Sequence, residues 1–409
     1  MSDLALGRRL MDHLEALARF TDDGDGLTRL YLSPSHRHAA DAVSTWMREA
    51  GMTVRLDALG TQIGRYEGAK ADAPALLVGS HIDTVRRAGK YDGTLGVLAA
   101  LTVVEALAKN GERLSFAVEV VAFGDEEGVR FPSTLRGSRA LAGTLDTAAL
   151  DERDAAGVSV REALIVFGAD PTRWGEAALS REAALGFVEV HIEQGPVLER
   201  AGRPVGVVTA INGARRLSVT VQGIAGHAGT SPMTMRRDSL VAAAEMILAV
   251  ERIARDARDV VATVGVIEAL PGAVNVIPGE TRFTIDARAP IDAVRDAVVY
   301  QIEEAIEGIA ARRGLKAKVT TTHRAPATVC DAQLITALDA SARATGLEPV
   351  HLPSGAGHDA MAMATLCPVA MLFVRCAGGI SHHPAEAITL EDADAAVRVL
   401  LHFLRAYNA

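Results

Sequence analysis

The chain has 409 residues, of which 49% are hydrophobic and 23% charged, and its formal net charge is −9 at pH 7. Since single hydrophobic cores stop growing at roughly 250–300 residues, we expect two domains. The negative charge argues against nucleic acid or an anionic membrane as the main partner. No apolar run reaches the ~18 residues that a membrane-spanning helix needs.

The cysteines and the N-terminal segment indicate where the protein works. Cys330, Cys367 and Cys376 are the only cysteines and form no CxxC pair, which favours a reducing compartment over a disulfide framework. The segment 1–20 is typical of an amphipathic helix with acidic residues, not of a signal peptide. We therefore expect a cytoplasmic protein.

The first half of the chain alternates predicted helices and strands. In chain order we expect a helix, two short strands, a buried strand, a helix and two further buried strands, at 36–51, 52–68, 75–80, 94–111, 116–124 and 186–195. Continuous apolar runs such as ALLVGS are typical of strands buried on both faces. Buried strands separated by helices predict a mainly parallel α/β sheet.

Near Asn212 the pattern changes to strands of alternating polarity. A strand, a helix, two strands, a helix and a strand are expected at 215–223, 236–256, 261–269, 280–289, 291–313 and 315–325. This β-α-β-β-α-β order is that of a ferredoxin-like α+β domain. Alternating helix and strand return from about Cys330, with the last helix after Glu391. The sequence therefore predicts a catalytic domain over 1–211 and 328–409, interrupted by an inserted domain over 212–327.

Imidazole and carboxylate side chains follow the predicted buried strands. They are His81 and Asp83, Asp92 in the same loop, the acidic triplet at 125–127, His191, and His382 with His383. The carboxyl ends of neighbouring parallel strands converge on one crevice, so we expect these groups to meet. Each of these groups alone would be typical of a solvated surface pair, but four groups at the ends of predicted strands favour a metal site.

Adjacent carboxylates repel one another unless a cation or proton neutralises them. Imidazole and carboxylate without thiolate suit zinc or manganese, and the number of clusters predicts two ions about 3.5–4 Å apart.

Several motifs together resemble the hydantoinase/carbamoylase family of amidases. They are GSHIDTV, YDGTLGVLAAL, EEGVRF, HIEQGPVLE, GHAGTSPM, NVIPG, SGAGHDA and GISHHPAE, and they run from residue 79 to residue 386. That family belongs to the two-metal hydrolases that include aminoacylases and dizinc exopeptidases. The resemblance implies a dizinc-exopeptidase-like catalytic domain, two divalent zinc or manganese ions, and hydrolysis of an N-carbamoyl (ureido) group. It also implies a homodimer joined through the inserted domain.

The resemblance assigns roles around the metal centre. It implies five metal ligands, His81, Asp92, Glu127, His191 and His382, with Asp92 as the bridge between the ions. The resemblance also implies that Glu126 is the general base. Adjacent residues leaving a strand face opposite ways, so Glu127 can turn to the metal while Glu126 faces the reacting water. Asp83 is expected to fix the imidazole tautomer of His81 with its carboxylate. His383 stands where relatives commonly have an amide or a small residue, so an exchange of roles between the two histidines stays open.

The resemblance also assigns residues to the substrate. His227 would be an oxyanion-type donor, in its own or the partner subunit's site. Asn275 and Arg288, expected on neighbouring strands of the inserted domain, would together hold the substrate's carboxylate. Gln194 and Gly357 would line the pocket on the catalytic side. Arg216 stands where allantoate amidohydrolases carry an arginine.

Several substrates compatible with this family remain as alternatives. Allantoate has two ureido arms and a carboxylate, so a second cationic contact such as Arg216 would help. N-carbamoyl-L-amino acids need an apolar side-chain pocket instead, and N-carbamoyl-β-alanine has one extra methylene. Arg216 and the segment LTRLYLSPSHRHAA favour allantoate, a substrate of purine catabolism whose hydrolysis releases ammonia and carbon dioxide. A dipeptidase and a metal-free binding protein on the same fold are the remaining alternatives.

Overall fold

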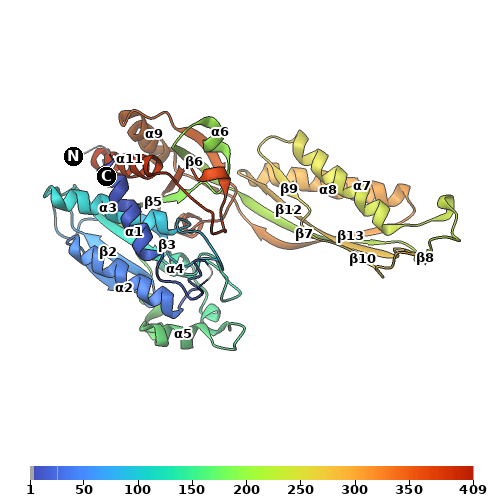
Figure 1. The fold of residues 1–409 in the computed structure, drawn as a ribbon, viewed down its shortest axis with the longest axis horizontal. Helices are drawn as coiled ribbons and strands as arrows, with labels where there is room; N and C mark the ends of the chain where they lie inside the picture. Colours follow the sequence, from blue (N-terminus) through green and yellow to red (C-terminus); the bar gives the residue numbers. More distant parts are fainter. Residues whose placement is uncertain (1–3, 25, 409) are drawn as a thin grey trace. The chain divides into compact units, whose positions relative to one another are not determined.

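The computed structural model describes residues 4–24 and 26–408, which divide into two compact units (Figure 1). The first unit comprises the chain up to Thr209, Cys330–Leu352 and the chain from Ala356 onward. The second comprises Ala210–Val329 and Pro353–Gly355. The predicted fold class, an α/β catalytic part interrupted by a ferredoxin-like α+β part, is confirmed.

The first unit is built on a mixed sheet whose central strands are parallel. Its strand order is β1-β2-β4-β3-β5-β16-β6. The bounds are Thr53–Leu56 (β1), Gln62–Tyr66 (β2), Ala75–His81 (β3), Ala117–Phe123 (β4), Ala184–Ile192 (β5), Val205–Ile211 (β6) and Val369–Val374 (β16), and β15 (Val350–Ser354) also pairs with β6. The strands β4, β3, β5 and β16 run parallel, and the outer pairs are antiparallel. Every residue of β3 and β4 is buried, which explains their continuous apolar sequences.

Helices enclose this sheet. They are α1 (Ala5–Leu17), α2 (Pro34–Glu49), α3 (Thr94–Lys109), α4 (Arg136–Leu141), α5 (Val160–Phe167), α6 (Val197–Ala201), α9 (Ala332–Ala344), α10 (Asp359–Met363) and α11 (Leu390–Ala406). The helix α3 packs directly on β3 and β5, and α1 and α11 pack against α3 (Figure 1). Burial therefore fixes α3, and with it the loop that enters the helix from β3.

The second unit has an antiparallel sheet with two helices on one face (Figure 1). Its strand order is β10-β12-β7-β13, and β9 also pairs with β12. The bounds are Gly213–Gln222 (β7), Ser239–Asp256 (α7), Val261–Thr263 (β9), Ile267–Leu270 (β10), Glu280–Ala289 (β12), Asp292–Arg312 (α8) and Lys316–Ala325 (β13). A small ribbon of β8 (Gly226–His227) and β11 (Val276–Ile277) lies at the end of this unit opposite β9 (Figure 1). Ala210 and Ile211 at the end of β6 pair with β14 (Thr328–Val329).

Some local expectations were wrong. The strand expected over 261–269 is two strands, β9 and β10. The helix expected from residue 236 begins at Ser239, because the side chain of Asp238 caps it by accepting from the amides of Leu240 and Val241. The strand β6 was not predicted. Within residues 4–24 and 26–408, no helix combines the length and apolar composition that a membrane crossing requires.

Candidate metal centre and substrate pocket

The parallel strands bring the predicted ligands to one edge of the sheet. His81 is the last residue of β3, the acidic triplet follows β4, and His191 lies near the end of β5. Because β4, β3, β5 and β16 are adjacent, their carboxyl ends meet, as expected for such sheets. Asp92 enters from the loop before α3, and His382 from the loop after β16.

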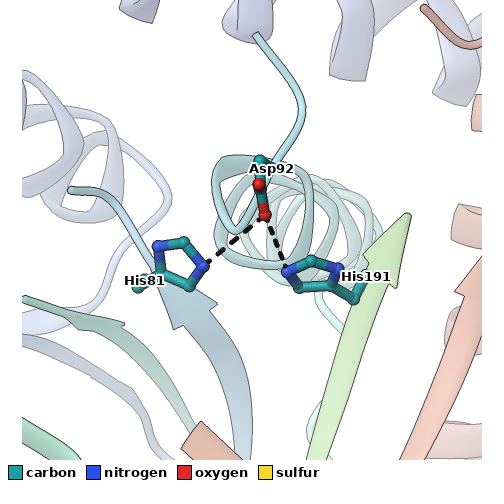
Figure 2. Close-up of side chains that lie close together, drawn as sticks. All are labelled: His81, Asp92 and His191. Carbon is teal, nitrogen blue, oxygen red and sulfur yellow. Dashed lines mark ion pairs between the residues drawn. The ribbon is translucent and has the colours of Figure 1, made fainter. Parts of the chain in front are cut away.

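Asp92 lies between two groups of ligand atoms. Its Oδ1 is 3.1 Å from Nε2 of His191 and 3.8 Å from Nε2 of His81 (Figure 2). Its Oδ2 is 3.1 Å from Nε2 of His382, and that nitrogen is 3.8 Å from Oε1 of Glu127. The side chains His81, Asp92 and His191 form one possible metal group, and Asp92, Glu127 and His382 form another. The structure thus gathers all five predicted ligands, with one carboxylate common to both groups.

Backbone carbonyls orient the two buried imidazoles. Nδ1 of His81 lies 2.9 Å from the carbonyl oxygen of Asp83, and Nδ1 of His191 lies 2.9 Å from that of Ile192. When Nδ1 donates to these oxygens, the lone pair of Nε2 faces the cluster, and that of His191 accepts there from the amide of Gly93 at 3.3 Å.

Two oxygens of Asp83 lie near His81, and the predicted effect of its carboxylate on the imidazole tautomer stays a prediction. Nδ1 of His81 lies 2.9 Å from the backbone carbonyl oxygen of Asp83 and 3.7 Å from its Oδ1. The carboxylate also accepts from the backbone amides of Glu126 and Glu127, each at 3.3 Å. Asp83 therefore fixes the segment that carries the two glutamates.

The cluster is strongly electronegative. Burial raises the pKa of Glu126 well above its usual range, and that of Glu127 to about 7, with nearby carboxylates adding to both shifts. The hydrogen bond to Asp92 raises the pKa of His382 to about 9. The buried Oε1 of Glu127 accepts no hydrogen bond among the described residues. Four carboxylates, those of Asp83, Asp92, Glu126 and Glu127, would be balanced by the four positive charges of two divalent ions. The donor set fits zinc or manganese.

The two adjacent histidines have different surroundings. Nε2 of His382 contacts Asp92, whereas Nδ1 of His383 accepts from the amide of Ala385 at 3.1 Å within a turn. The predicted pocket residue Gln194 also reaches the cluster, because its Nε2 lies 3.0 Å from Oδ2 of Asp92 and 3.0 Å from Oγ of Ser381. This geometry favours His382 over His383 as the ligand.

Sequence reasoning gave no role to Glu386, which connects two of the loops. Its Oε1 accepts from the amides of Tyr91 and Asp92 at 2.9 and 3.1 Å, and its Oε2 accepts from Oγ of Ser381 at 3.0 Å. It is 4% exposed, so these bonds are shielded from water. The only signal was its place at the end of the GISHHPAE motif.

Two further residues near the centre carried weaker signals. Gly93 has φ +63°, and a Cβ there would lie 2.4 Å from the imidazole of His81, so only glycine permits this approach. Glu189 is a fully buried acid within the apolar strand β5, and it accepts from Oγ of Ser80 at 2.7 Å and from the amide of Ala360 at 2.9 Å. An acid inside an apolar run was the signal for Glu189.

The predicted substrate residues of the second unit include a pair in one pocket. This pocket has a volume of about 650 Å³, and its lining includes Arg216, Asp286, Arg288 and Gly355. Nε and Nη2 of Arg288 donate to the two carboxylate oxygens of Asp286, each at 3.0 Å, and Nη1 donates to the carbonyl of Gly355 at 2.8 Å. Nε of Arg216 donates to Oδ2 of Asp286 at 3.1 Å. Gly357 is exposed and lies just before α10.

Asn275 and Arg288 do not lie on neighbouring strands, as was expected, while their joint role on the substrate's carboxylate stays a prediction. The carbonyl of Asn275 accepts from the amide of Ala228, and its neighbour Val276 pairs with His227. Arg288 is at the other end of β12, eight residues beyond Glu280. At ~3.4 Å per residue this strand segment spans about 27 Å, too far for both side chains of one chain to hold one carboxylate. The structure groups Asn275 with His227, and Arg288 with Arg216.

Comparisons with known proteins agree with this architecture. The profile described as peptidase family M20/M25/M40 matches residues 77–406. The chain is 43% identical to an N-carbamoyl-L-amino acid amidohydrolase of Geobacillus stearothermophilus, over 97% of each chain. It is 42% identical to an allantoate deiminase of Arabidopsis thaliana, over 96% of this chain and 81% of the relative. The crystal structure of an amidase of the hydantoinase/carbamoylase family from Burkholderia multivorans superposes with a TM-score of 0.93 at 34% identity, over 98% of this chain and 97% of that one. The chain therefore belongs to peptidase family M20/M25/M40 and to the hydantoinase/carbamoylase amidases within it, and it is a hydrolase of amide-type C–N bonds.

Proposed function

We propose that the protein hydrolyses the ureido C–N bond of allantoate, releasing ammonia and carbon dioxide. The observation that carries this proposal is the set of two ligand groups sharing Asp92, with the carboxylate of Glu126, 12% exposed, beside them. Allantoate is favoured because the pocket of the second unit holds two guanidinium groups, those of Arg216 and Arg288. The alternative is an N-carbamoyl-L-amino acid, which the relative from Geobacillus stearothermophilus hydrolyses according to its name.

The metal ligands, Glu126 and His227 have different proposed roles in the hydrolysis. Two divalent ions held by the five ligands would supply electrophilic activation of water and of the ureido carbonyl. Glu126 would take a proton from the attacking water and return it to the leaving nitrogen. Burial and the neighbouring carboxylates raise its pKa, and a raised pKa suits a group that must both accept and donate a proton near neutral pH. His227 would donate a hydrogen bond to the oxyanion that develops on the carbamoyl oxygen when water attacks the carbon.

A substrate panel tests the proposal. Purified protein is reconstituted with zinc or with manganese and incubated with allantoate, N-carbamoyl-L-amino acids, N-carbamoyl-β-alanine and dipeptides, with detection of released ammonia or amino acid. We expect the highest kcat/KM with allantoate. Hydrolysis of dipeptides without release of ammonia from any ureido acid would contradict the proposal.

Arg288 is proposed to bind the substrate's carboxylate. Replacement of Arg288 with lysine keeps the charge but removes the planar fork. The bound transition state should lose about 1–3 kcal/mol of stabilisation, and kcat/KM should fall correspondingly, mainly through a higher KM. The matched control is Arg282→Lys, because Arg282 lies on the same strand and pairs with Glu280 as Arg288 pairs with Asp286. An allantoate analogue with an amide in place of the carboxylate should be equally poor with wild type and the Arg288 variant. Efficient hydrolysis of that analogue by the wild type would contradict the proposal that Arg288 binds the substrate's carboxylate.

His227 and Asn275 are proposed to act in the site of a partner subunit. They lie at the Glu280 end of the inserted unit, and Glu280 is about 27 Å along β12 from Arg288, farther than a small ureido acid spans (Figure 1). His227 is exposed, and the neighbouring Met233 and Val274 are 75% and 106% exposed, as an uncovered contact surface would be. We therefore propose a homodimer that joins through the inserted unit.

Mixing two inactive variants tests this arrangement. Glu126→Gln and His227→Ala homodimers are prepared separately, then mixed under conditions that allow subunits to exchange. If His227 acts in the partner's site, each mixed dimer contains one intact site, and random exchange restores about a quarter of wild-type activity. If His227 acts in its own site, both sites of the mixed dimer lack a group and the mixture stays inactive.

A further inference from the structure

The pocket in the second unit contains a carboxylate that the reaction does not use. Asp286 lies directly opposite Arg216 in the pairing of β12 with β7. Arg288 is two residues further along β12, so its side chain leaves the sheet on the same face. All three side chains line the same pocket of about 650 Å³.

Asp286 binds both guanidinium groups yet leaves donors on each. Arg288 uses three N–H groups, two to Asp286 and one to the carbonyl of Gly355, and Arg216 uses one to Asp286. Since an arginine has five N–H groups, the bonds among the described residues leave two on Arg288 and four on Arg216 for a ligand. These N–H groups can donate hydrogen bonds to a planar anion such as a carboxylate.

Asp286 is ionised in this setting. Burial alone would raise the pKa of Asp286, but the hydrogen bonds and charges of Arg288, and then of Arg216, lower it. The pocket therefore holds two positive charges and one negative charge, a net charge of +1.

We propose that Asp286 sets the charge of the substrate that this pocket accepts, and that the matching substrates are ureido acids with a single carboxylate. A net charge of +1 attracts one carboxylate, while the Asp286 carboxylate repels a second one placed beside the guanidinium groups. Asp286 is a specificity-determining residue that acts through charge, in addition to orienting Arg288. The inference rests on the proposed function in one respect, namely that Arg288 binds the substrate's carboxylate.

Binding of two simple acids of similar size tests the inference. Propionate carries one charge and malonate two, and their dissociation constants are measured by calorimetry on the full-length, metal-loaded protein. Asp286→Asn removes one negative charge a few ångströms from the second carboxylate of malonate, so malonate should gain more affinity than propionate. The dissociation constant of propionate divided by that of malonate should therefore increase about ten-fold. Every variant keeps the same metal ligands, so binding of either acid at the ions contributes equally to all of them.

Two further variants separate charge from structure. The double variant Asp286→Asn/Arg216→Gln again has a net charge of +1, so its ratio should return to within about two-fold of wild type. Glu280→Gln removes a carboxylate from the same strand, where it pairs with Arg282, and should leave the ratio unchanged. Should Asp286→Asn fail to fold, Arg216→Gln alone decides the matter, because the pocket then has no net charge and propionate should bind about ten-fold more weakly.

An unchanged ratio in Asp286→Asn, an equal change in Glu280→Gln, or no return in the double variant would each overturn the inference. The proposed function can fail separately. If the wild type releases no ammonia from any ureido acid while the ratio shifts as described, the proposed function fails and the role of Asp286 in anion selection stands.

Discussion

Replacement of Glu126 with glutamine is expected to lower kcat by about 10²–10⁴-fold while the protein keeps both metal ions. Glutamine has the shape of glutamate but cannot accept a proton from water. The backbone amide of Glu126 donates to Asp83, and the substitution leaves this bond in place, so the fold of the segment should survive. Steady-state kinetics together with metal analysis of the same preparation measures the two quantities.

The neighbouring residue supplies the matched control for this prediction. Glu127→Gln makes the same chemical change one position along the chain, but Oε1 of Glu127 faces His382 in the second ligand group. This variant should lose one ion as well as activity. If Glu126→Gln loses metal and Glu127→Gln does not, the roles of base and ligand are exchanged. Near-normal turnover of a fully metallated Glu126→Gln enzyme would exclude Glu126 as the base.

Asp92→Asn should have the largest effect on metal content, with loss of both ions and activity at background. Each carboxylate oxygen of Asp92 faces a different ligand group, and an amide offers one neutral oxygen in place of two charged ones. In the wild type, free metal at 100 times its dissociation constant should stabilise the fold by about 2.7 kcal/mol, so the melting temperature should rise on reconstitution. The melting temperature of Asp92→Asn should not respond to metal.

Single histidine variants provide the comparison. His81→Ala and His382→Ala each remove a ligand from one of the two groups that share Asp92, so metal content should fall by less than in Asp92→Asn. His383→Ala should keep both ions, because its Nδ1 faces the amide of Ala385 in a turn. Loss of metal from His383→Ala with retention in His382→Ala would reverse the ligand assignment.

The location of the imidazole and carboxylate cluster could be predicted from sequence because it depends on topology. Apolar runs identify strands buried on both faces, and parallel strands bring their carboxyl ends to one edge. His81 is the last residue of β3 and His191 the last but one of β5, so their meeting followed once the two strands were recognised as parallel neighbours. The chemistry of the donor set followed from residue type alone.

The details that sequence could not supply depend on which end of an element, or which atom, makes a contact. Asn275 lies just before β12 and Arg288 near its last residue, so almost the whole length of this strand separates them. Nδ1 of His81 lies closer to the backbone oxygen of Asp83, at 2.9 Å, than to its carboxylate, at 3.7 Å, and a sequence motif does not reveal which oxygen is nearer. Glu386 acts on Asp92 across 294 residues of sequence through a hydrogen bond to a backbone amide, which no spacing reveals.

Because the second unit is inserted between the two parts of the first, the ribosome makes the ligands of the two groups at different times. His81, Asp92 and His191 all precede the insertion, whereas the other group needs His382, which is made 191 residues after His191. At about 5–20 residues per second, a ribosome takes roughly 10–40 s to cover that distance. During this interval the emerging chain carries the three ligands His81, Asp92 and His191, while Glu126 and Glu127 still lack His382. The strand β16, which pairs with β5, and Glu386, which accepts from the amide of Asp92, are also made only after the insertion, so the edge of the sheet that gathers the ligands is completed by the second part of the first unit.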